Sequence, residues 1–143
     1  MKYNVFNKTL VLFIVFMFLL SGCTKKNNDR FTLDPDSIKL ASVIKDVLSL
    51  NKNLILSIGT GLCENCKIVE ETLENYKSEN NSDDVEILIY TNYSDRDTFS
   101  ELRITVSPTT LFINKDHLVI KKVVGAFNDI DLKSFLKETG FIQ

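Results

Sequence analysis

Apolar residues in the first half of the chain follow a helical period, then a strand-like run, then a helical period again. Residues 37–50 carry an apolar stripe at helical spacing, with Asp36 or Ser37 placed to cap the helix. Residues 53–59 form a short, almost continuous apolar run, which favours a buried strand. A second helix is expected at about residues 63–77. The positions expected on the buried sides of these helices are Leu40, Val43, Ile44, Val47, Leu48, Cys66, Val69, Leu73 and Tyr76.

The second half of the chain predicts two further helices and three further strands. Residues 85–91 and the segments 108–114 and 118–124 read as strands. Residues 95–103 read as a short helix, and a last helix is expected to be capped by Asp129. The apolar positions expected to face inward from these two helices are Phe99, Leu102, Ile130, Leu132, Phe135 and Leu136.

The order of these elements predicts an α/β fold. Strands that alternate with helices pair in parallel through right-handed crossovers, so the first strands should be parallel. The last two strands are separated by a short turn and should pair antiparallel. We therefore expect a four-stranded mixed sheet flanked by helices on both faces.

The N-terminus has the pattern of an export signal. Lys2 and Lys8 precede an unbroken apolar run at residues 10–20. As a helix this run would be about 16 Å long, roughly half of a ~30 Å hydrocarbon core, so a permanent membrane span is disfavoured.

The segment that ends the apolar run, Leu20-Ser21-Gly22-Cys23, resembles the lipobox of bacterial lipoproteins. The resemblance implies cleavage before Cys23 and a diacylglyceryl group on its sulfur, which would hold the protein on a membrane surface outside the cytoplasm. Residues 1–22 are then a lipoprotein signal peptide. The alternatives are an ordinary secretory signal, with Cys23 left as an odd thiol, and an uncleaved signal anchor.

Residues 23–36 are expected to be the lipidated cysteine and a flexible tether, and residues 37–143 the folded domain. The tether segment is polar, contains Pro35 and has no apolar period. Phe31 and Leu33 could instead add a short edge strand.

Composition and charge narrow the class of protein. A chain of 143 residues suits one compact domain, which we expect to be a monomer. A net charge of −2 provides no basic field for a nucleic-acid partner. Three cysteines are too few for a small disulfide scaffold, and a single His excludes most zinc-finger spacings. The adjacent charges Glu70–Glu71 and Lys121–Lys122 are expected to lie on solvated faces.

Two cysteines, Cys63 and Cys66, stand three residues apart where a strand leads into a helix. On a helix this spacing places both sulfurs on one face. Cys63 would lie at the helix N-terminus, where free amide N–H groups and the helix dipole stabilise a thiolate. Cys63 is therefore the candidate nucleophile, and Cys66, one turn deeper, the resolving thiol.

Other interpretations of the cysteine pair remain open. Half of a zinc site would need two more ligands, and His117 lies in a distant turn. A purely structural disulfide would close a loop of a few residues and stabilise little. Two cysteines buried by coincidence are the third alternative. Redox chemistry needs neither a metal nor an organic cofactor, and we expect none.

The sequence resembles the thioredoxin family over about residues 37–143. The resemblance is carried by the Cys-Glu-Asn-Cys motif with Lys67 directly after it, by residues 106–109 (Val-Ser-Pro-Thr) and by residues 124–126 (Val-Gly-Ala). It implies a thioredoxin-like fold, a cis peptide bond before Pro108 beside the cysteines, and a Ser107 backbone that binds an extended substrate. It also implies that Gly125 leaves room beside the same groove. Taken alone, Pro108 has the alternative reading of a trans proline that starts an edge strand.

The sequence departs from the family pattern at several positions. Leu62 stands where the family often has Trp, so the substrate face lacks an indole. Ser57 stands where thioredoxin has a buried acid that helps move the proton of the inner thiol, so water or another group must do that here. Glu64 and Asn65 replace the usual dipeptide between the cysteines, and Glu64 should oppose thiolate formation somewhat.

These features together predict an extracytoplasmic, membrane-tethered thiol–disulfide oxidoreductase. Its substrates would be cysteine-containing exported proteins, and a membrane or extracytoplasmic redox partner would reset the pair. Two other functions stay open. One is a non-catalytic binding or accessory lipoprotein of a secretion or transport system, and the other is a redox sensor.

Overall fold

The computed structural model describes residues 30–59, 61–80, 83–92 and 94–143. The predicted signal peptide (residues 1–22), Cys23 and the first part of the predicted tether lie outside the described residues. The described strands form one sheet in the order β1-β5-β4-β2-β3.

The centre of the sheet is mixed, as predicted. Strand β2 (Asn53–Ile58) runs parallel to β3 (Val85–Tyr90) and antiparallel to β4 (Thr109–Ile113). Strand β4 pairs antiparallel with β5 (Leu118–Val124), which confirms the predicted C-terminal hairpin. Strand β2 lies between β3 and β4 and ends at Ile58, shortly before Cys63 in the chain.

A fifth strand corrects the prediction of four. Strand β1 (Phe31–Thr32) pairs antiparallel with β5 and lies inside the segment predicted as tether. Phe31 and Leu33 are buried against the sheet, and the Leu33 N–H donates a hydrogen bond to the His117 carbonyl at 2.9 Å. Burying two large apolar side chains outweighs the entropy of a free segment, so the folded part begins earlier than residue 37.

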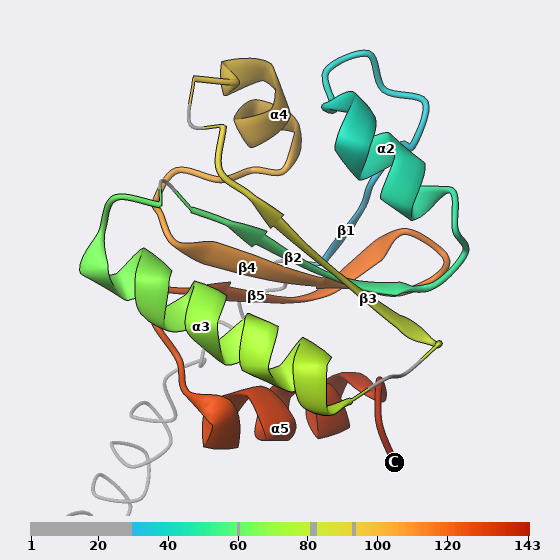
Figure 1. The fold of residues 1–143 in the computed structure, drawn as a ribbon. Coiled ribbons are helices and arrows are strands. Elements are labelled where there is room, and N and C mark those ends of the chain that lie inside the picture. Colours follow the sequence, from blue (N-terminus) through green and yellow to red (C-terminus); the bar gives the residue numbers. More distant parts are fainter. Residues whose placement is uncertain (1–29, 60, 81–82, 93) are drawn as a thin grey trace, which may run out of the picture.

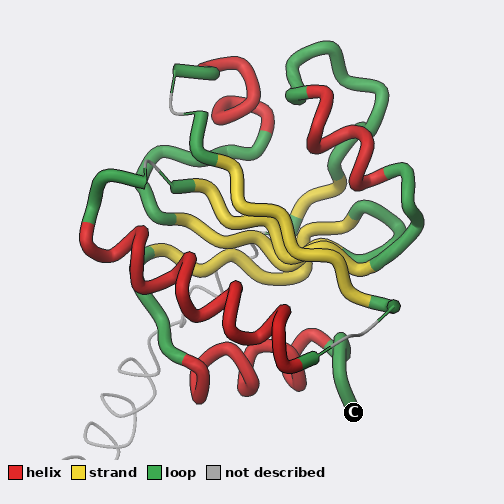
Figure 2. Tube along the Cα trace, viewed as in Figure 1, coloured by secondary structure: helices red, strands yellow, loops and turns green. Residues whose placement is uncertain are grey.

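Helices cover both faces of the sheet, as predicted. Helices α3 (Glu64–Glu79) and α5 (Asp129–Thr139) lie on one face. Helices α2 (Ser42–Leu48) and α4 (Arg96–Glu101) lie on the other (Figure 1). Figure 2 shows the strands as a layer between these two pairs of helices.

Each face has its own apolar core, and β2 contributes to both because its side chains alternate. On the α2 and α4 face the main members are Ile44, Leu48, Leu54, Leu56, Ile58, Leu102 and Leu111. On the α3 and α5 face they are Ile55, Val69, Leu73, Phe112, Leu132 and Leu136. Alternation along β2 directs Ser57 to the same face as Ile55, the face that α3 covers.

Two helix ends differ from the prediction. Helix α2 begins at Ser42 after Ala41, not at Ser37, and Val43 on its predicted buried side is exposed. Helix α5 is capped by Asn128, whose side-chain oxygen accepts the N–H groups of Ile130 and Asp131. With Asn128 as cap, the Ile130 side chain is 80% exposed, contrary to the prediction.

Lys121 and Lys122, which we expected on a solvated face, both interact with other residues. Lys121 forms an ion pair with Glu138 at 2.7 Å, and its ammonium group lies 4.7 Å from the centre of the Phe135 ring. Lys122 donates a hydrogen bond to the Arg103 carbonyl at 2.6 Å.

Within the ranges given above, no helix is both long enough and apolar enough to span a bilayer.

Candidate active site

Cys63 is the N-cap of α3. Its backbone is extended (φ −96°, ψ 146°), and its sulfur accepts a hydrogen bond from the Cys66 N–H at 3.1 Å. The Cys63 side chain is partly exposed. The first turn of a helix has free N–H groups that favour negative charge, so this position stabilises a thiolate on Cys63 when the pair is reduced.

Cys63 and Cys66 are joined by a disulfide, with their Cα atoms 5.2 Å apart. Cys66 is 1% exposed, so one sulfur of the pair is accessible and the other is buried. This asymmetry is what a nucleophile and a resolving thiol require. Among the described side chains, no group of three or more His, Cys, Asp or Glu residues is arranged to hold a metal ion.

The segment that contains Pro108 lies beside the buried sulfur. The Ser107–Pro108 peptide bond is cis, as the resemblance implies, and the Ser107 hydroxyl lies 3.6 Å from the Cys66 sulfur. The Pro108 carbonyl accepts a hydrogen bond from the Gly125 N–H at 2.9 Å. Gly125 has φ +95°, a conformation that favours glycine. The fold therefore brings three segments that are far apart in the chain, those of Cys66, Ser107–Pro108 and Gly125, to one place.

Exposed apolar side chains stand on the segments that surround the disulfide. Leu62 is 81% exposed, directly before Cys63. Val106 and Val124 are 55% and 57% exposed and directly precede Ser107 and Gly125. We predicted Leu62 from the sequence but not the two valines. Their position next to predicted groove residues is the signal that could have identified them.

The polar residues at the start of α3 are in contact with solvent. Glu64, Asn65 and Lys67 are all exposed, so Glu64 is screened by water from the Cys63 sulfur. Ser57, which stands in the place of the family's buried acid, is 2% exposed, and its hydroxyl oxygen accepts a hydrogen bond from the Thr110 hydroxyl at 3.3 Å.

Sequence analysis missed Glu70, which it assigned to a solvated face. One oxygen of its carboxyl group, Oε1, is buried without a hydrogen-bond partner. Glu70 lies four residues after Cys66 on α3, a spacing that places two side chains on the same face of a helix. That spacing is the sequence signal that could have identified it.

The acid directly before α4, Asp95, has a shifted pKa. Asp95 accepts hydrogen bonds from the Thr98 N–H at 3.0 Å and from the Tyr90 hydroxyl at 2.7 Å. These two bonds, the backbone bond first, lower the pKa of Asp95 below its ordinary value. Burial raises the pKa of Tyr90, and the neighbouring Asp95 raises it further. Asp95 is thereby held as a charged N-cap of α4.

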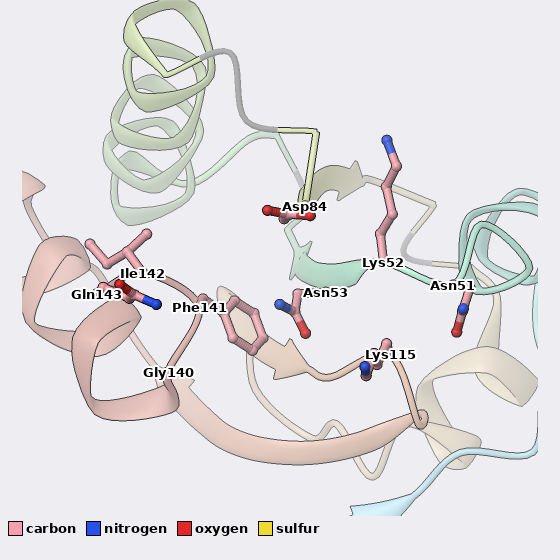
Figure 3. A pocket seen from close by; sticks show the side chains of 9 residues that line it. All are labelled: Asn51, Lys52, Asn53, Asp84, Lys115, Gly140, Phe141, Ile142 and Gln143. Carbon is pink, nitrogen blue, oxygen red and sulfur yellow. The ribbon is translucent and has the colours of Figure 1, made fainter.

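A cavity of about 650 Å³ lies beside the start of β2 and the C-terminal residues (Figure 3). Asn53, at the start of β2, lines it together with Asp84, Lys115 and Phe141. Cys63 instead follows the far end of β2, and a six-residue strand spans about 20 Å. The cavity is therefore separate from the cysteine site.

Comparisons with known proteins show similarity in structure. No protein-family model and no curated protein sequence matches the chain. A thioredoxin from Fasciola hepatica has a TM-score of 0.60 at 18% identity, over 71% of this chain and 95% of the thioredoxin. Mitochondrial thioredoxin 3 from Saccharomyces cerevisiae, in its oxidised form, has a TM-score of 0.54 at 22% identity, over 68% of this chain and 88% of its own.

A bacterial structure is similar as well. StoA from Bacillus subtilis has a TM-score of 0.50 at 16% identity, over 59% of this chain and 82% of StoA. These similarities confirm the predicted fold class, because each covers between 59% and 71% of this chain. The chain has a thioredoxin-like fold.

Proposed function

We propose that the protein is a thiol–disulfide oxidoreductase in which Cys63 and Cys66 exchange a disulfide with cysteines of other proteins. One observation carries the proposal. The partly exposed Cys63 sulfur accepts an N–H at the start of α3 and is bonded to a sulfur that is 1% exposed. The thioredoxin-like fold supports it, because this pair stands next to the cis Pro108 segment.

The exchange proceeds in two steps that conserve atoms and electrons. In the reducing direction the Cys63 thiolate attacks a substrate disulfide, forms a mixed disulfide and releases one substrate thiolate. Cys66 then loses its proton and attacks the Cys63 sulfur, which restores the Cys63–Cys66 bond and releases the second substrate thiol. Two electrons pass to the substrate. The same steps in reverse oxidise a dithiol, and a redox partner resets the pair in either case.

The groove beside Pro108 is the proposed binding site for an extended substrate segment. Leu62, Val106 and Val124 present exposed apolar surface around it. Apolar surface that remains exposed next to a reactive group favours contact with a partner chain. The backbone of Ser107 and the open space at Gly125 complete this site.

The experiment is a comparison of residues 24–143 with serine variants. The wild-type fragment should accelerate both insulin reduction by dithiothreitol and oxidative refolding of a reduced protein. Cys63→Ser should abolish both activities, and Cys66→Ser should accumulate mixed disulfides with substrate, which can be isolated and identified. Equal activity in the wild type and the variants rejects an enzyme. If the wild-type fragment is folded but inactive in both assays, the function is that of a non-catalytic binding module.

We propose further that a lipid on Cys23 holds the domain on the extracytoplasmic face of a bacterial membrane, where it acts on exported proteins. Because β1 begins at Phe31, the linker is residues 24–30, which can reach at most about 25 Å. Labelling of cells with a radioactive fatty acid should mark the wild type but not Cys23→Ala. Incorporation of label into Cys23→Ala contradicts the proposal.

A further inference from the structure

Glu70 has an unusual environment for a carboxyl group. In the part of the chain that the structure describes, its Oε1 is the buried side-chain nitrogen or oxygen atom for which no hydrogen-bond partner is found. Burying such an oxygen without a partner costs free energy. A residue that lowers the stability of the fold in this way is a candidate for a chemical role.

The Glu70 carboxyl group lies close to the buried sulfur of the disulfide. Gly59 provides a common reference point, because a Cβ atom placed on it would lie 3.5 Å from Glu70 Oε1 and 3.6 Å from Cys66 Sγ. The two atoms are therefore no more than about 7 Å apart, the sum of these two distances. A separation within this limit is bridged by a single water molecule, and direct transfer requires the two atoms to come within hydrogen-bond distance during the reaction.

The resolving step needs a group of this kind. In the mixed disulfide Cys66 is a thiol, and a thiol must lose its proton before it attacks. Cys66 is 1% exposed, so bulk water has little access to it. The Ser107 hydroxyl at 3.6 Å is a poor base, and the Ser57 oxygen already accepts the Thr110 hydroxyl.

We propose that Glu70 accepts the proton of the Cys66 thiol as Cys66 attacks the mixed disulfide at Cys63. This inference rests on the proposed function. The proton moves from sulfur to the Glu70 carboxylate, the Cys66 sulfur forms the bond to Cys63, and the departing substrate thiolate takes up one proton from solvent. Glu70 later releases to solvent the proton that it accepted from Cys66.

Three other polar groups could influence this proton. Glu64 and Lys67, on the same helix as Cys66, are exposed, so water screens their charges. Ser107, on the segment that packs against Cys66, contributes an uncharged hydroxyl. Gly59 at the end of β2 has no side chain. Glu70 is thus the partly buried side chain whose buried carboxyl oxygen lies within about 7 Å of the resolving sulfur.

The test measures the resolving step separately from the first attack. The reduced fragment 24–143 is mixed in a stopped-flow instrument with a nitrobenzoate disulfide that releases a coloured thiolate. The Cys63 attack releases one equivalent in a concentration-dependent phase, and the Cys66 attack releases a second equivalent in a concentration-independent phase. Glu70→Gln keeps the shape of the side chain but cannot accept the proton. Glu71→Gln, the same change at an exposed neighbour on α3, is the matched control.

In Glu70→Gln the second phase should be at least about 10-fold slower near pH 7, at the low end of what a positioned base contributes. The deficit should close at alkaline pH, where hydroxide removes the proton, while the first phase and all phases of Glu71→Gln match the wild type. A second phase within twofold of the wild type across the pH range overturns the inference, and so does equal slowing of both phases. Absence of both phases in the wild type overturns the proposed function itself.

Discussion

Replacing Leu33 by alanine tests whether the segment before residue 37 belongs to the folded domain. Leu33 is 2% exposed, packs in the core on the α2 and α4 face, and follows strand β1. Truncating a buried leucine to alanine costs about 2–5 kcal/mol, the transfer free energy plus the cavity that is left. Leu33 lies at the edge of the sheet, where neighbours can partly close the cavity, so we expect about 3 kcal/mol.

The assay is equilibrium unfolding of the oxidised fragment 24–143 in urea. A loss of about 3 kcal/mol lowers the urea midpoint by about 1–3 M for a domain with an m-value of roughly 1–3 kcal/mol/M. Ile38→Ala is the matched control, because Ile38 also lies before α2 but is 93% exposed. It should change the free energy of unfolding by less than about 0.5 kcal/mol.

Equal midpoints for Leu33→Ala and Ile38→Ala would refute the reasoning. Residues 31–33 would then contribute nothing to the fold, and the tether would extend to residue 36 as the sequence first suggested. A large difference instead establishes that the domain starts at β1 and that only residues 24–30 separate it from Cys23.

Three further predictions concern the site and its surroundings. Leu62→Ser should leave the urea midpoint unchanged, because Leu62 is 81% exposed. It should lower kcat/KM for insulin by up to about 10-fold, while the rate with a small disulfide stays the same. Equal effects on both substrates would contradict a role of Leu62 in binding a protein substrate. In single-cysteine variants, Cys63 should react with iodoacetamide near pH 7 at least about 10 times faster than Cys66, because Cys66 is 1% exposed. Similar rates would contradict the assignment of Cys63 as the nucleophile. Asp95→Ala should cost about 1 kcal/mol at neutral pH. Because the folded-state pKa of Asp95 is lowered, this difference is complete above its ordinary value of 3.8 and disappears as the pH falls through the folded value, which unfolding at neutral and strongly acidic pH can check.

The candidate site was predictable where its chemistry is local. Cys63 and Cys66 are three residues apart at the start of a helix, and the N-cap bond between them forms within that segment. The order of helices and strands along the chain followed from the alternation of apolar runs, and the lengths of the connections predicted the C-terminal hairpin and the parallel pairing of the first strands. Pro108 and Gly125 were found through the resemblance, since neither residue indicates a groove by itself.

The start of α2 illustrates a feature that the sequence pattern could not predict. The free Ala41 N–H donates to the Thr98 hydroxyl at 2.8 Å, and this hydroxyl donates to the Lys39 carbonyl at 2.9 Å. A threonine on α4, 57 residues away, thus accepts the N–H of Ala41, which is the N-cap in place of the predicted Asp36 or Ser37. Caps from distant residues leave no signal in the helix's own sequence.

The sequence by itself determined the elements, their order, the mixed sheet and the two cysteines, because each depends on hydrophobic period or on contacts within a few residues. Tertiary structure decided that Phe31 and Leu33 join the sheet and that one oxygen of Glu70 is buried beside Cys66. The physical reason is that burial is a property of what packs over a residue. The spacing from Cys66 marks Glu70 as a candidate, but the sequence does not tell whether water or the glycine that follows β2 lies opposite it.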